Sequence, residues 1–337
     1  MGESLMNASP YIRPHRVRPR RQQGIALLSI MLILTLMTLI VAEVTFAYRN
    51  QLRRTTGRHQ LEQARWYALS AEELAVRVLK QSFDDDDGVI HLGQYWATEG
   101  MVFPVEDGTI AGEILDAQGC FNLNAMNVSD NTDGSTPLEV DIFAYLLEEL
   151  EISASEAMSI SWATRDWVYN GEDYTQYGDD HYMSRPVPHL AGQTAMRDIS
   201  EWRAVAGVSQ GIALRVMPYL CATPSNRLQV NVNTIPADQP ELLSALYEGD
   251  LPIDQARRAL EQRPANGWDT VDEFLNSSLL ANYNASNMRS LVTVNSSYFE
   301  LRANSEFAGT RTGLNSLLRR NDDNQLSVVR RKFGAFL

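Results

Sequence analysis

The hydrophobic pattern of the chain begins with one long apolar segment. Residues 25–42 (IALLSIMLILTLMTLIVA) are eighteen uncharged residues interrupted only by Ser29, Thr35 and Thr38. At about 1.5 Å per residue, a helix of this length is sufficient to cross the hydrocarbon core of a bilayer. The segment therefore predicts a membrane-spanning helix close to the N-terminus.

The same helix is predicted to continue to residue 82. Between residues 43 and 81 the only strong helix breaker is Gly57. Small and apolar residues recur there at spacings of three and four, which is typical of a helix face packed on a sheet. The acidic run before Gly88 is expected to end the helix, because carboxylates oppose the helix dipole at a C-terminus. The predicted packed face is Leu61, Ala64, Ala68, Ala71, Ala75 and Val78, and the predicted solvated residues are Glu62, Arg65, Glu72, Glu73 and Arg77.

Alternating polarity predicts strands near both ends of the remaining chain. Residues 109–124 indicate two short strands around a turn at Asp116–Gly119, and residues 297–307 and 325–334 indicate two more. A turn-rich loop is expected between the last two, because it contains Gly309 and Gly313. These pieces predict a split antiparallel sheet with a mostly helical segment inserted between its parts.

The helical segment contains an internal repeat. Residues 121–124 (FNLN) recur as residues 230–233 (VNVN), and each copy leads into two helices and a short acidic-aromatic segment. We interpret this layout as a duplication. The asparagines are expected to hydrogen-bond nearby backbone at strand-to-helix turns.

The second copy resembles the helix-hairpin-helix layout of DNA-binding competence proteins. That layout holds phosphate through a glycine-rich hairpin, whereas residues 247–252 (YEGDLP) carry two acids and one glycine. An acidic hairpin repels phosphate, so no nucleic acid is expected as a partner. A membrane-anchored periplasmic DNA-uptake protein is nevertheless kept as the alternative function.

Basic residues are concentrated at the N-terminus. The 337-residue chain has a formal net charge of −13, yet residues 1–24 hold five arginines and a single acid, Glu3. Removing those five from 29 basic residues and Glu3 from 42 acidic residues leaves a net charge of −17. A basic cluster before an apolar helix places its N-terminal end in the cytoplasm, so the acidic remainder is expected to be exported.

The two cysteines, Cys120 and Cys221, lie close to the two asparagine motifs. Export to an oxidising compartment favours a disulfide between them. The alternative is a pair of unpaired buried thiols. No His/Asp pair lies near either cysteine in the sequence, which argues against a catalytic thiol.

An acidic loop at residues 164–186 is the most chemically informative part of the exported body. Its five carboxylates are expected to repel one another unless a cation neutralises them, and calcium is favoured because it accepts many oxygen ligands in irregular geometry. The spacing is not that of an EF-hand, and a solvated acidic loop is the alternative. The candidate ligands are Glu172, Asp173, Asp179, Asp180 and, more weakly, Asp166.

The boundary between leader and apolar helix resembles that of type IV prepilins. In that class a prepilin peptidase cuts after the glycine and methylates the new N-terminus, which implies cleavage between Gly24 and Ile25. A cleaved secretory signal peptide is disfavoured because the residues around Ala47 make a poor cleavage site. Most members have Glu at the fifth mature position, where this chain has Ser29. A subunit with no neighbour above it has no amine for that Glu to pair with, which favours the fibre tip.

The motifs taken in order resemble the K-type minor pseudopilins (the GspK family) of the bacterial type II secretion system. They are the Gly24 leader, Ser29, residues 116–124 (DAQGCFNLN), residues 165–168 (RDWV) with the acidic loop, and residues 230–237 (VNVNTIPA). The resemblance implies an α+β pseudopilin (type IV pilin-like) fold, with a long N-terminal helix against a small antiparallel sheet and a large inserted α-helical domain. The implied segments are a leader (1–24), an assembly helix (25–82), a first β region (83–124), the insert (125–289) and a second β region (290–337).

The resemblance also implies a function without enzymatic activity. Such a protein caps the pseudopilus tip with the I-type and J-type minor pseudopilins and initiates assembly, and so supports export of folded proteins across the outer membrane. Other pseudopilins, the prepilin peptidase and the inner membrane are implied partners, with secreted cargo and the secretin as further candidates. An anchored hydrolase is disfavoured, because no Gly-x-Ser-x-Gly element or His-containing triad is visible.

Overall fold

The computed structural model describes residues 24–85, 88–171, 174–283 and 286–334. The chain divides into two compact units, Met1–His59 and Gln60–Leu337. Helix α1 (Ile25–Asp85) begins in the first unit and ends in the second. The predicted end at residue 82 is therefore close to the observed one.

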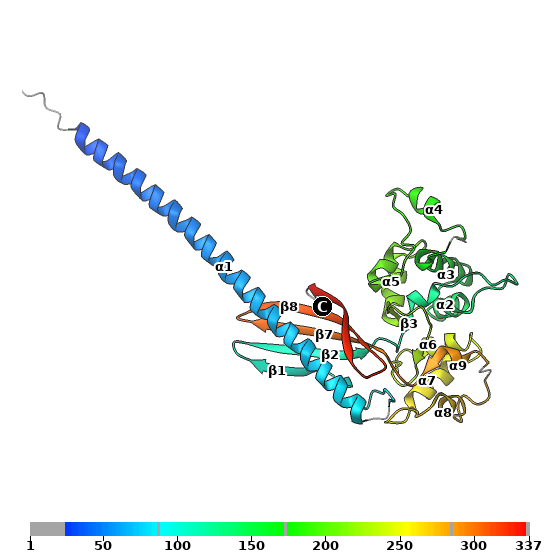
Figure 1. The fold of residues 1–337 in the computed structure, drawn as a ribbon. Helices are drawn as coiled ribbons and strands as arrows, with labels where there is room; N and C mark the ends of the chain where they lie inside the picture. The colour runs from blue at the N-terminus through cyan, green and yellow to red at the C-terminus, as the bar shows by residue number, and fades with distance from the viewer. Residues whose placement is uncertain (1–23, 86–87, 172–173, 284–285, 335–337) are drawn as a thin grey trace, which may run out of the picture. The chain divides into compact units, whose positions relative to one another are not determined.

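The second unit contains a five-stranded antiparallel sheet with strand order β1-β2-β7-β8-β9 (Figure 1). The C-terminal part of α1 packs on one face of this sheet through small residues, as the spacing of alanines predicts. Ala64 and Ala68 are fully buried, and the Ser305 hydroxyl of the sheet donates to the Ala64 carbonyl at 2.6 Å. Small side chains let the helix backbone approach the strands this closely. The strands are β1 (Met101–Val105), β2 (Gly108–Asp116), β7 (Tyr298–Phe307), β8 (Thr310–Arg320) and β9 (Leu326–Gly334).

The prediction of a loop between the strands at 297–307 and 325–334 is wrong. Residues 310–320 form β8, which lies between β7 and β9. The turn is confined to Ala308 and Gly309, whose φ angles are 47° and 81°. Gly313 is a strand residue paired with Asn304. The burial of Leu314, Ser316 and Leu318 outweighs the turn propensity of one glycine.

The helical insert lies between β2 and β7 and follows the predicted repeat. Each half opens on a short strand that pairs in parallel with a strand at its own end, β3 with β4 and β5 with β6. The short strands are β3 (Phe121–Asn122), β4 (Leu220–Cys221), β5 (Val230–Asn231) and β6 (Val292–Thr293). The α-helices are α2 (Leu138–Glu149), α3 (Ala154–Val168), α4 (Asp179–Met183), α5 (Gln210–Val216), α6 (Pro240–Leu246), α7 (Ile253–Glu261), α8 (Val271–Leu275) and α9 (Met288–Leu291). The 3₁₀ turns of the insert are η2 (Leu123–Met126), η3 (Ile199–Ala204) and η4 (Met217–Tyr219), whereas η1 (Tyr95–Ala97) lies outside it, between α1 and β1.

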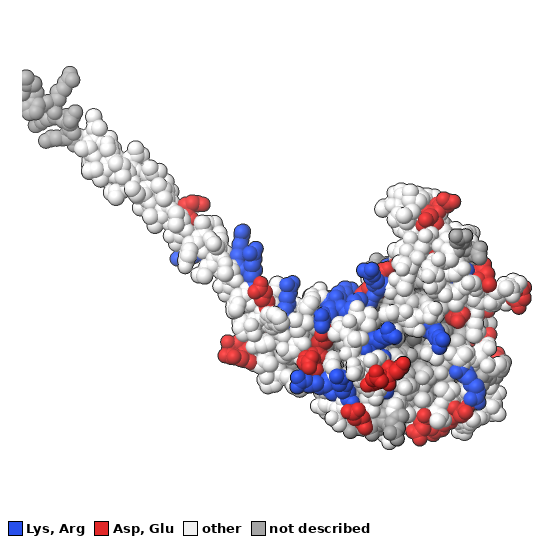
Figure 2. Space-filling view, in the orientation of Figure 1, with Lys and Arg blue, Asp and Glu red and all other residues white. Residues whose placement is uncertain are grey.

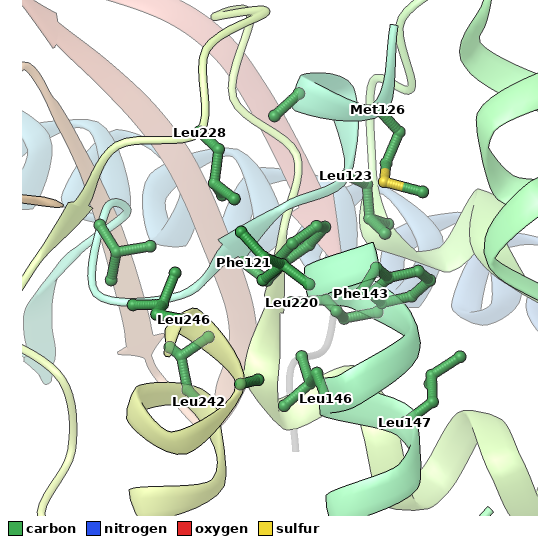
Figure 3. Close-up of a cluster of buried hydrophobic side chains, with 14 of the residues drawn as sticks. Phe121, Leu123, Met126, Phe143, Leu146, Leu147, Leu220, Leu228, Leu242 and Leu246 are labelled. Carbon is green, nitrogen blue, oxygen red and sulfur yellow. The ribbon is translucent and has the colours of Figure 1, made fainter. Parts of the chain in front are cut away.

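One hydrophobic core joins the two halves of the insert (Figure 3). Phe121 of β3 stacks on Phe143 of α2 with ring centroids 4.9 Å apart. Leu242 and Leu246 of α6 belong to the same buried cluster, so helices of the first and second halves share one interior. Burial of such side chains contributes about 1.5–3 kcal/mol each, so this core stabilises the insert.

Glu72 departs from the prediction that it is solvated. Its side chain is only 7% exposed and lies on the sheet-facing side of α1. Arg331 of β9 binds it through two nitrogens, at 2.7 and 2.9 Å, and the Ser316 hydroxyl donates to it at 2.5 Å. Because Glu72 follows Ala68 by four residues, it belongs to the packed stripe, and a two-point ion pair compensates its desolvation.

Replacing Arg331 should therefore destabilise the fold. Arg331→Ala leaves the buried carboxylate of Glu72 with a hydroxyl as its remaining partner, and we expect the free energy of unfolding to fall by about 1–3 kcal/mol. Urea denaturation measures this change. Arg319→Ala, at an exposed position of the neighbouring strand, should change it by less than about 0.5 kcal/mol. Equal losses in the two variants would contradict a stabilising role for the pair.

Candidate functional site

The N-terminal segment places its predicted residues as expected for a membrane anchor. Helix α1 begins at Ile25, directly after Gly24. It is long and apolar enough to cross a membrane, with a mean hydropathy of 2.8 in its most apolar window. The side chains of residues 25–42 are exposed throughout. This apolar helix surface is suited to contact with lipid or with neighbouring helices.

The polar residues of this segment are satisfied within their own helix. The Ser29 hydroxyl donates to the Ile25 carbonyl at 2.8 Å, and the Thr35 and Thr38 hydroxyls bond to carbonyls of the preceding turn in the same way. A hydroxyl bonded in this manner adds little cost in hydrocarbon. Position 29 therefore needs no polar partner from another chain.

The junction between sheet and insert is built on Asp116, a residue that sequence reasoning placed only in a turn. Asp116 ends β2, and one of its carboxylate oxygens accepts hydrogen bonds from Asn231, Thr234 and Ser296, at 2.9, 2.6 and 2.6 Å. Burial raises the pKa of Asp116, although hydrogen bonds from Ser296, Thr234, the Gln118 backbone and Asn231 act in the opposite direction. The cluster joins the strand that leads into the insert to the segment that leaves it.

The asparagines of the repeat perform equivalent tasks in the two halves. The Asn124 side-chain amide binds the backbone of Met196 through two hydrogen bonds, N–H to Oδ1 at 2.7 Å and Nδ2 to the carbonyl at 2.9 Å. Asn233 binds the backbone of Trp268 through the same two bonds, at 2.8 and 3.0 Å. The predicted structural role of these residues is thereby confirmed.

The first asparagine of each motif also caps its own turn. Asn122 accepts from the Asn124 N–H, and Asn231 accepts from the Asn233 N–H at 3.0 Å. These matching bonds show that the duplication extends to individual hydrogen bonds, although few residues outside the motifs are identical.

Cys120 and Cys221 form the predicted disulfide, with Cα atoms 5.8 Å apart and a sequence separation of 101. The bond joins the start of β3 to β4 and closes the first half of the insert. A cross-link around a loop of this length contributes about 4–5 kcal/mol in the chain-entropy model. It fits a protein that functions outside the reducing cytoplasm.

In the acidic loop, Asp166 has a role inside the protein. The side chain is fully buried beside that of Arg165, which it contacts at 3.0 Å. Its second oxygen accepts from the Thr175 N–H and hydroxyl, at 3.0 and 2.6 Å, and from the Tyr177 N–H at 3.3 Å. The second oxygen therefore fixes Thr175 and Tyr177 against α3, and the first pairs with Arg165 of the same helix.

The other candidate ligands are divided between described and undescribed residues. Asp179 accepts from the Ala191 N–H at 3.0 Å through one oxygen, and Asp180 is exposed in the first turn of α4. Glu172 and Asp173 lie outside the described residues. In the part of the chain that is described, no three His, Cys, Asp or Glu side chains gather as a metal-binding group.

Comparison with known proteins assigns a family model to each half of the insert. Family models described as type II secretion system (T2SS) protein K match residues 119–225 and 230–295. These ranges coincide with the first and second copies of the repeat. The type II secretion system protein K of Aeromonas hydrophila is 39% identical, over 94% of this chain and 98% of that protein. This chain belongs to the type II secretion system protein K family.

Other protein K family members support the same conclusion. The protein of Klebsiella pneumoniae is 36% identical, over 94% of this chain and 98% of its own. A chain in the crystal structure of the GspK-GspI-GspJ complex from enterotoxigenic Escherichia coli superposes with a TM-score of 0.77 at 34% identity, covering 84% of this chain and all of that one. The α+β pseudopilin fold is thus confirmed. The chain is a minor pseudopilin, which is a structural subunit and not a known class of enzyme.

The asparagine bonds yield a test of the repeat. Asn124→Asp replaces a donor by an acceptor that faces the carbonyls of Met196 and Thr223 in a site that is 2% exposed. We expect the free energy of unfolding to fall by on the order of 3 kcal/mol. Asn276→Asp, at an exposed position, should lose less than about 1 kcal/mol. A small loss for Asn124→Asp in urea denaturation would show that the two-point bond is dispensable.

Proposed function

We propose that this minor pseudopilin occupies the tip of the type II secretion pseudopilus. There it binds the I-type and J-type minor pseudopilins, initiates assembly and so supports export of folded proteins across the outer membrane. The observation that carries the proposal is the insert, which separates two adjacent strands of the sheet, together with the likeness to a chain solved in a GspK-GspI-GspJ complex.

The point of attachment of the insert supports the tip position. The insert leaves from Asp116 and returns at Tyr298, next to Phe299, whose ring lies 5.5 Å from that of Phe83 near the end of α1. It is therefore attached at the end of the sheet that is farther along α1 from Ile25. A subunit stacked beyond that end of the sheet would collide with the insert. Subunits added at the opposite end, toward Ile25, would not.

Ser29 supports the same position. Most pilins have Glu at the position of Ser29, and a carboxylate in a bilayer is unfavourable by several kcal/mol unless it is paired. Its usual partner in the family is the N-terminal amine of the neighbouring subunit. The Ser29 hydroxyl is satisfied by Ile25 of its own helix. A terminal subunit can thus enter the fibre without that partner.

The proposal includes processing and location. Prepilin peptidase is inferred to cleave between Gly24 and Ile25 and to methylate Ile25, while α1 stays in the inner membrane and the acidic body enters the periplasm. The disulfide between Cys120 and Cys221 favours a periplasmic body.

Two measurements test the proposal. Mass spectrometry of the membrane-extracted protein should find N-methylated Ile25 as the first residue. Co-expression of the full chain with the I-type and J-type pseudopilins of the same bacterium should give a complex that contains all three. Any other N-terminus would exclude prepilin processing, and recovery of this chain without the other two would exclude the proposed tip complex.

A calcium ion in the acidic loop is part of the proposal. Carboxylate oxygens suit calcium, and Asp180 and the second oxygen of Asp179 have no hydrogen-bond partner within the described residues. Asp166 is removed from the ligand set, because both of its oxygens are bonded inside the loop. The proposed ligands are thus Glu172, Asp173, Asp179 and Asp180.

Thermal unfolding distinguishes these roles. We expect calcium at 100 times its Kd to stabilise the protein by about 2.7 kcal/mol and a chelator to reverse the effect. Asp180→Asn should abolish the response to calcium and leave the chelated protein unchanged. Asp166→Asn should lower the melting temperature with or without calcium. An identical melting temperature with calcium and with chelator would refute the site.

A further inference from the structure

A cleft of about 830 Å³ lies between the insert and the sheet face that points away from α1. The sheet contributes Glu113, Arg302, Leu317 and Arg330 to its lining. From the insert, η3, α5 and η4 contribute the other side, with Arg203, Leu214 and Met217 among the lining residues. Asp116, Thr234 and both disulfide cysteines also border the cleft.

A β-bulge turns Arg330 toward this cleft. Up to Val328 the residues of β9 pair one for one with β8, and the register then shifts, so that Leu318 pairs with Val328 and Leu317 with Arg330. Val329 is the extra residue. The shift reverses the alternation of side chains, which places Arg331 on Glu72 at the α1 face and Arg330 in the cleft.

The Arg330 guanidinium lacks a partner within the described chain. Its Nε and Nη1 atoms are buried, yet neither makes a hydrogen bond. Burying guanidinium N–H groups without acceptors is unfavourable. A site that holds such donors is prepared for an anionic acceptor from outside.

The neighbouring charges show why no internal acid fills this role. Glu113 and Glu300 both lie beside Arg302, at 3.8 and 3.1 Å. Asp198 accepts from Lys332 at 3.1 Å. Arg203, in contrast, has only the Met217 sulfur as a hydrogen-bond acceptor in the described structure, at 3.4 Å. Two arginines of the cleft thus remain without a carboxylate.

We propose that the cleft binds an acidic, partly apolar peptide segment of a partner protein, with one carboxylate on Arg330. A guanidinium holds a carboxylate through two parallel hydrogen bonds. Leu92 and Leu214, which are 43% and 64% exposed, offer apolar contacts that a small inorganic anion would not use. Exposed acids at Glu99 and Asp238 in the same lining restrict the favourable position of a carboxylate to the arginines and disfavour a polyanion such as nucleic acid.

The edge of the sheet favours an extended segment. Among the described residues, strand β9 pairs with β8 and with no second strand, so the outer side of its backbone can accept an added strand. Basic side chains gather over this C-terminal strand (Figure 2), where Arg330, Arg331 and Lys332 follow one another in a strongly acidic body. Glu72 and Asp198 already pair with Arg331 and Lys332, so Arg330 is the base of these three that remains for an acidic segment.

Peptide binding to the full chain in detergent tests the proposal. The probe is a fluorescein-labelled, end-capped hexapeptide of alternating Glu and Leu, and fluorescence anisotropy measures its Kd at low salt. Arg330→Gln should weaken binding about tenfold, the equivalent of one charge-assisted hydrogen bond. Leu214→Glu, at an exposed site, should weaken it comparably by repulsion. Arg311→Gln, on the same sheet outside the cleft, should leave the Kd unchanged.

The control probes test whether binding requires both the carboxylates and the peptide backbone of the probe. A peptide with Gln in place of Glu should bind about tenfold more weakly to the wild type and equally to Arg330→Gln. The assignment is overturned if the acidic peptide does not bind, if Arg330→Gln and Leu214→Glu bind it like the wild type, or if a single-stranded oligonucleotide binds more tightly than the peptide through Arg330. Matching melting temperatures establish that the variants are folded.

Discussion

The buried carboxylate of Asp116 is the interaction on which the arrangement of the sheet and the insert depends. It receives Asn231 and Thr234 from the second repeat and Ser296 from the segment that returns to the sheet. Asn231 in turn donates to the carbonyl of Ile90, which follows α1. Helix, sheet and insert therefore meet at a single hydrogen-bonded cluster. A buried acid is costly unless its oxygens are satisfied, and here the donors come from parts of the chain that must all be in place.

The duplication supplies the geometry for this junction. In both halves an Asn-x-Asn motif caps a 3₁₀ or irregular turn and ties a distant loop to a short parallel pair of strands. In the first half the leading asparagine, Asn122, bonds to the backbone of Ser225 inside the insert. In the second half the equivalent Asn231 reaches Asp116 instead. One copy of the repeat thus closes the insert on itself, and the other attaches it to the pseudopilin body.

Local sequence signals predicted the features that depend on neighbouring residues. The apolar run, the stripe of alanines and strands β7 and β9 follow from periodicity, and the asparagine repeat is visible as a repeated motif. Strand β8 was missed, because Gly309 and Gly313 suggest turns and only pairing with β7 and β9 reveals the strand. Glu72 and Asp116 were misjudged for a related reason. Their partners lie more than 100 residues away in sequence, and no local pattern encodes such a pairing. The acidic loop shows a further limit, since composition alone could not separate Asp166, which bonds inside the loop, from acids that remain available.

The pairing of β2 with β7 imposes an order on folding during synthesis. The chain is synthesised from its N-terminus, so α1, β1 and β2 exist before any strand that β2 can pair with on its inner side. The whole insert must follow before β7 appears, and Arg331, the counter-ion of Glu72, is delivered only at the end of the last strand. Until then the apolar face of the helix and one edge of β2 are uncovered. The insert has its own core and a disulfide and can fold in the meantime. The inserted domain can therefore reach its folded state before the sheet from which it extends.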